Sequence, residues 1–237
     1  MAINIYQLWL DLKSNTNTKQ GGQLRVRDFN NWVNQISIQL FNEKFAAWEK
    51  DQMLVDNLSR PFLESKSFIT TKTALNFSLL SYPKDYSYFS SARIYKTSEG
   101  KVVKCPEPNK KANSAFADLC EVTVTKVTNA QWGAVCENKI IPPTTNRVRI
   151  TQYEGGFKVA PKEIGYVTLD YLRLPKKAKL VFLPGLNQTY DSVNSIDLEW
   201  NETVINEFLA RLQIAYSEFI REQFLYSTGQ NKKDTTV

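Results

Sequence analysis

Residues 165–182 read GYVTLDYLRLPKKAKLVF, and within this stretch the chain changes its character. As far as Leu174, apolar residues alternate with polar ones, and Val, Thr, Leu and Tyr predominate, a pattern typical of a β-strand. Pro175 and three lysines within the next four positions interrupt the pattern. This basic step is therefore a candidate functional site, a guard of a strand edge, or a hinge between two parts of the protein.

The composition indicates a folded protein. The chain has 237 residues, of which 42% are hydrophobic, enough for a sizeable core in one large domain or two small ones. Its 30 Lys and Arg residues against 24 Asp and Glu residues give a net charge of +6, which permits contact with nucleic acid without requiring it. No apolar run approaches the ~18 residues that a membrane span needs, so we expect a soluble protein without membrane contact.

The residue types argue against an enzyme. Histidine, the commonest general acid or base near neutral pH and a frequent metal ligand, is absent from the sequence. No phosphate-binding glycine loop, zinc-protease motif or nucleophile elbow occurs. The three cysteines lack the spacing of a metal site or a disulfide framework, so we expect free thiols. We therefore predict no catalytic residues, no cofactor and no metal.

Both ends of the chain carry helical patterns, and the middle does not. Between residues 29 and 48, and again between 205 and 224, apolar residues recur at the spacing of an amphipathic helix. The intervening chain shows alternating strand patterns, and Gly155 and Gly156 predict a hairpin turn because glycine readily adopts positive φ.

This order predicts an α+β fold in which the N- and C-terminal segments form a helical bundle that carries an inserted antiparallel β module. The predicted parts are an N-terminal helical part (1–66), the inserted β module (67–185), a C-terminal helix completing the bundle (186–226) and a flexible tail (227–237).

Several segments in order resemble a known group of phage proteins. They are INIYQLWLDLKSN (3–15), LRVRDFNNWVNQISIQLFNEKF (24–45), LSRPFL (58–63), YPKDYSYFSSARIY (82–95), IGYVTLDYLRLPKKAKLVF (164–182) and DLEWNETVINEFLARLQIAYSEFIREQ (197–223). As a set they resemble the ring, or head-to-tail connector, proteins in the neck of crAss-like phages that infect Bacteroidetes. The resemblance covers most of the chain, except the loop 97–117 and the tail.

The resemblance implies a non-enzymatic virion protein, assembled in the cytoplasm of the host bacterium. Such a subunit joins copies of itself in a ring, contacts the portal protein and other neck or tail proteins, and extends the channel through which double-stranded DNA passes without specific binding. Its functional residues are interface surfaces. The alternative function is a nucleic-acid-binding protein that uses the basic step and aromatic residues such as Tyr86, Tyr88 and Phe89.

Charge is segregated around the basic step. Residues 171–190 contain no acidic residue, and residues 180–210 contain no basic one. Oppositely charged patches on neighbouring subunits would set the register of a ring. Two alternatives stay open: the lysines guard a strand edge, or they line the channel. The candidate interface residues are Arg173, Lys176, Lys177 and Lys179 on the basic side, and Asp197, Glu199 and Glu202 on the acidic side.

The tail is polar, with one aliphatic residue at its end, so we expect it to be mobile in a monomer. Lys232 and Lys233 are the candidate residues by which it docks on an adjacent neck or portal component.

Overall fold

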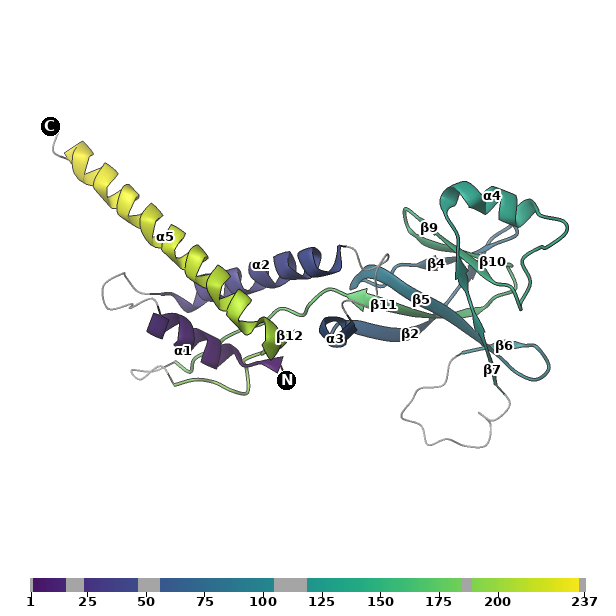
Figure 1. The fold of residues 1–237 in the computed structure, drawn as a ribbon, viewed down its shortest axis with the longest axis horizontal. Coiled ribbons are helices and arrows are strands. Elements are labelled where there is room, and N and C mark those ends of the chain that lie inside the picture. Colours follow the sequence, from purple (N-terminus) through teal and green to yellow (C-terminus); the bar gives the residue numbers. More distant parts are fainter. Residues whose placement is uncertain (1, 16–23, 47–55, 105–118, 185–188, 235–237) are drawn as a thin grey trace. The chain divides into compact units, whose positions relative to one another are not determined.

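The computed structural model describes residues 2–15, 24–46, 56–104, 119–184 and 189–234 (Figure 1). The chain divides into two compact units. The terminal unit combines Met1–Phe62 with Leu174–Val237, and the inserted unit is Leu63–Arg173. The basic step therefore begins where the chain leaves the inserted unit.

The inserted unit consists mainly of strands in two five-stranded sheets. Its elements are β2 (Leu63–Ile69), β3 (Thr71–Lys72), β4 (Ser78–Ser81), β5 (Tyr86–Lys96), β6 (Val102–Val103), β7 (Cys120–Thr123), β8 (Thr125–Lys126), α4 (Asn129–Glu137), β9 (Arg149–Tyr153), β10 (Gly156–Ala160) and β11 (Tyr166–Arg173). One sheet has the order β3-β4-β10-β9-β8, and the other has β2-β11-β5-β6 with β7 also on β5. The neighbouring strands are antiparallel except β8 and β9.

Two bent strands join the sheets. Thr70 alone separates β2 from β3, and Val124 alone separates β7 from β8, so each segment leaves one sheet and continues in the other. The side-chain hydroxyl of buried Thr70 donates to the Ile164 carbonyl, which holds the first bend. Strand pairing thus runs around the unit as a closed circuit, which leaves few strand edges open.

The core of the inserted unit lies inside this circuit. Inward-facing residues of both sheets alternate with outward-facing ones, as the pleat of a strand requires. The buried cluster comprises Leu80, Phe89, Ala92, Ile94, Val124, Val148, Ile150, Phe157, Val159, Ile164, Val167, Leu169 and Tyr171. The predicted hairpin is confirmed, because β9 and β10 pair with Tyr153 opposite Gly156.

The terminal unit combines helices with extended chain. Its elements are β1 (Ala2–Ile3), α1 (Ile5–Asn15), α2 (Val26–Phe45), α3 (Asp56–Ser59), β12 (Leu198–Asn201), the 3₁₀ helix η3 (Glu202–Val204) and α5 (Ile205–Asp234). Helix α5 packs against α1 and α2, and β1 pairs with β12. Lys44 of α2 forms an ion pair with Glu207 of α5 at 2.8 Å.

The predicted helical bundle is wrong. The fold is mixed α+β and rich in sheet, and the terminal helices do not form a bundle. Trp200 of strand β12 is fully buried against Phe45 and Phe62, with ring centroids 6.2 and 4.8 Å away, and its indole nitrogen donates to Ser37 of α2. A strand therefore covers part of the apolar face of α2. Helical periodicity showed that this face is buried, but it does not specify what covers it.

Helix α5 continues to Asp234, beyond the predicted start of the flexible tail at residue 227. Lys232 and Lys233 thus belong to its last turns, and their side chains lie outside the described residues. Much of the loop 97–117 is also outside them. Among the described residues, no helix combines the length and the apolar composition needed to cross a bilayer.

Candidate subunit interface

Lys179 of the basic step lies on an irregular hairpin, which we call the connector hairpin, and Lys177 immediately precedes it. It consists of residues 178–183 and 189–196. Lys179 and Ile196 exchange two backbone hydrogen bonds of 3.0 and 2.7 Å, and the Asp191 amide donates to the Val181 carbonyl at 3.0 Å. Phe182 and Tyr190 face each other in a further bridge.

Two asparagines of α2 hold the first half of this hairpin. The Asn34 side-chain amide donates to the Ala178 carbonyl and accepts from the Ala178 amide, both at 2.9 Å. Asn30 makes the same pair of bonds with Leu180, at 3.0 and 2.8 Å. The two asparagines are four residues apart and so project from one face of the helix. Their side-chain amides form the hydrogen bonds with the hairpin backbone that a neighbouring strand would otherwise form.

This attachment explains why the side chain of Lys179 is exposed. Side chains of extended chain alternate in direction, so the binding of residues 178 and 180 to α2 turns the intervening residue away. Ala178 and Leu180 are buried, whereas Lys177 and Lys179 are exposed. Tyr6 of α1 supports the other side of the hairpin, with its ring stacked on Tyr190 at 4.4 Å.

The second half of the hairpin is shaped by Asp191. Its carboxylate accepts hydrogen bonds from the backbone amides of Val193 and Asn194, at 3.0 and 3.1 Å, and from the Asn194 side chain at 2.6 Å. These bonds, above all the one from the Asn194 side chain, hold the pKa of Asp191 below its ordinary value. The carboxylate of Asp191 therefore stabilises a turn within its own chain.

The connector hairpin also exposes apolar side chains. Val193 is 88% exposed and Ile196 is 48% exposed, and Leu183 lies open to solvent as well. Ile196 is paired with Lys179, so apolar and basic side chains are neighbours on this surface. Exposed apolar groups bordered by charge are typical of protein–protein contacts.

Most of the acidic candidates have partners inside the chain. Glu199 accepts the Lys176 amide at 2.9 Å, and its carboxylate lies 3.3 Å from the Lys176 ammonium. Asp197 accepts the Ile5 amide at 2.9 Å, at the start of α1. Glu202, in η3, is exposed. The basic and acidic segments therefore contact each other within a single chain, through Lys176 and Glu199.

Arg173 belongs to the inserted unit and not to the terminal unit that carries the connector hairpin. It ends β11 in the inserted unit, where its Nε lies 3.8 Å from a carboxylate oxygen of Glu64. Glu64 also accepts from the Tyr171 hydroxyl at 3.4 Å, and Tyr171 donates to Asp85 at 3.0 Å. Burial, followed by the bond to Asp85, raises the pKa of Tyr171. Arg173 thus belongs to a local polar cluster of the inserted unit, whereas Lys177 and Lys179 belong to the terminal unit.

The residues that position the hairpin were not predicted. Asparagine is unfavourable inside a helix because its side chain competes for backbone hydrogen bonds. The spacing of Asn30 and Asn34, four positions apart on the predicted helix, was the signal in the sequence. It could have indicated that their side chains bind the backbone of another segment.

The aromatic residues that the alternative function, nucleic-acid binding, would use lie largely in the hydrophobic core. Phe89 is buried, and Tyr86 lies against Phe157 with ring centroids 5.6 Å apart. Cys120 and Cys136 are free thiols, whereas Cys105 lies outside the described residues. Across the described ranges, no group of three or more Cys, Asp or Glu side chains is placed to hold a metal ion.

No protein-family model matches the chain, and no curated protein matches its sequence.

Proposed function

We propose that this protein is a non-enzymatic structural subunit that forms a ring in the portal-to-tail neck of a phage virion. The ordered set of segments that resembles neck ring proteins supports the location. The observation that carries the assembly function is the connector hairpin, on which Leu183, Val193 and Ile196 are exposed beside Lys177 and Lys179. Copies of the chain associate through this surface, and the ring adapts the portal to the tail around the DNA channel.

A ring places one surface of a subunit against a different surface of the next copy. Burial of exposed apolar side chains supplies most of the free energy of such an interface, whereas charges mainly set its register and suppress wrong partners. The acidic contribution of the proposed interface comes from Glu202, because Glu199 and Asp197 bind groups of their own chain.

The proposal is tested with a variant that makes the hairpin surface acidic. Val193→Asp combined with Ile196→Asp removes two exposed apolar side chains, and because neither is in the core, we expect thermal stability to stay within about 0.5 kcal/mol of the parent. Ile140→Asp is the matched control, since Ile140 is 90% exposed and lies in the inserted unit.

Size-exclusion chromatography with light scattering gives the mass of the assembly, and electron microscopy class averages show whether it is a closed ring. We expect rings for the parent chain and for Ile140→Asp, and monomers for the double variant. If the double variant assembles over the same range of protein concentration as the parent, the hairpin is a solvated surface and not an interface.

A further inference from the structure

The net positive charge of the protein resides in the inserted unit. Leu63–Arg173 contains 16 Lys and Arg residues and 10 Asp and Glu residues, a balance of +6. The terminal unit contains 14 of each and is neutral. The unit that contains the two five-stranded sheets is therefore the basic one.

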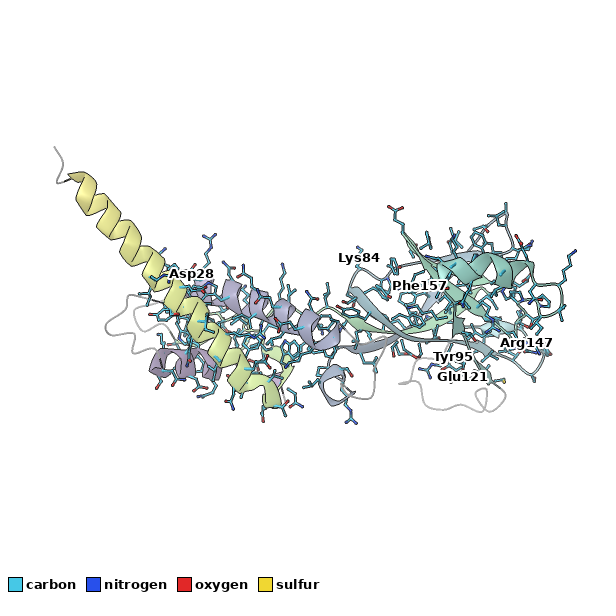
Figure 2. The ribbon with its side chains drawn as sticks, turned by 45° about the horizontal axis from the view of Figure 1, so that its top comes forward. Asp28, Lys84, Tyr95, Glu121, Arg147 and Phe157 are labelled. Atoms are coloured by element: carbon cyan, nitrogen blue, oxygen red, sulfur yellow. The ribbon has the colours of Figure 1, made fainter. Side chains whose placement is uncertain are left out.

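Four basic residues gather at one end of this unit, and we call them the basic patch: Lys96, Lys101, Lys104 and Arg147. Lys96 is the last residue of β5, and Lys101 and Lys104 flank β6, which pairs with that end of β5. The Thr97 amide donates to the Lys101 carbonyl at 3.0 Å. Figure 2 shows Arg147 toward the same end as Tyr95 of β5, with Lys84 toward the opposite end.

A hydrogen bond of Lys96 links the β5–β6 hairpin to the segment that contains Arg147. Its ammonium donates to the side-chain oxygen of Asn146, the residue before Arg147. Lys101, Lys104 and Arg147 are exposed. None of the four forms an ion pair with a carboxylate among the described residues.

The burial of Lys96 points to an anionic ligand. The residue is 6% exposed, and the partner of its ammonium in the described part of the chain is a neutral amide. A buried charge without a counter-charge is unfavourable, and an anion bound beside it removes part of that cost. Among the residues that the structure describes, two acidic residues lie close to the basic patch: Glu99 in the β5–β6 turn, and Glu121, which Arg93 and Tyr95 bind at 3.5 and 3.3 Å.

We infer that the basic patch binds phosphate groups of a nucleic-acid backbone, without reading sequence. Lysine and arginine side chains at the end of a rigid strand unit neutralise successive phosphates and release counterions, the source of sequence-independent affinity. Such contacts let a protein slide along DNA. The inference goes beyond the ring proposal, because it concerns the other unit and a single chain suffices for it.

The test measures binding of the full-length protein to a fluorescein-labelled DNA duplex by fluorescence anisotropy, between about 50 and 200 mM salt. The patch variant is Lys101→Gln, Lys104→Gln and Arg147→Gln, all at exposed positions. The matched control is Arg25→Gln, Arg27→Gln and Arg60→Gln, which removes the same charge from exposed positions of the terminal unit.

We expect the parent and the control to bind the duplex alike. The patch variant should bind roughly tenfold or more weakly, and its salt slope should fall by about 0.9 for each phosphate that it no longer neutralises. A duplex of another sequence should give the same affinity.

Three results would overturn the inference. The parent fails to bind at the lowest salt; the two triple variants weaken binding equally, so that net charge alone matters; or the parent binds vesicles containing phosphatidylserine in preference to DNA. Light scattering on the same samples reports assembly separately, so a failure of the ring proposal is distinguishable from a failure of this one.

Discussion

Replacing Asn34 by alanine tests whether side-chain amides of α2 hold the connector hairpin. The substitution removes both hydrogen bonds to the backbone of Ala178, which is 3% exposed and so leaves its amide and carbonyl without water. At roughly 0.5–1.5 kcal/mol for each bond, with the added cost of leaving buried groups unpaired, the loss is about 2–3 kcal/mol. Alanine returns about 0.5 kcal/mol through its higher helix propensity. The expected net destabilisation is about 2 kcal/mol.

Urea unfolding followed by tryptophan fluorescence measures this change. Four of the five tryptophans lie in the terminal unit, which contains α2 and the hairpin, so the signal reports mainly on that unit. With m near 2 kcal/mol per molar urea, the midpoint should fall by about 1 M. Asn31→Ala is the matched control, because Asn31 is exposed on the same helix, and it should raise stability slightly. Equal midpoints for Asn34→Ala and Asn31→Ala would refute the reasoning.

Two further sets of substitutions test the inserted unit and the charged interface. Gly156→Ala should lower the melting temperature by several degrees, because its φ of +151° disfavours a side chain and a Cβ would lie 2.0 Å from the carbonyl oxygen of Leu80. Gly133→Ala, where a Cβ meets nothing within 4 Å, should be neutral or slightly stabilising, and calorimetry compares the two. Lys177→Glu should weaken assembly in low salt, and Glu202→Lys in the same chain should partly restore it; light scattering that shows no effect of either change would leave the lysine a solvated surface residue.

The sequence alone determined much of the local structure. Alternating apolar residues around β11 and the two glycines after Tyr153 identify strands and a hairpin, because the pleat and the turn impose local requirements on residue type. Likewise, the periodic apolar residues of α2 and α5 identify helices with one buried face. These features depend on neighbours within a few positions along the chain.

Only the tertiary structure decided what covers those faces and where the charges go. The strand that contains Trp200, together with helix α5, packs against α2, and Asn34 binds backbone 144 residues away. Lys176 pairs with Glu199 of its own chain, although the segregation of charge is equally compatible with an interface between copies. The physical reason is that hydrophobic burial is non-directional, so any apolar partner stabilises a buried face. A sequence pattern therefore shows that a face is buried, whereas the packing of the whole unit determines which segment covers it.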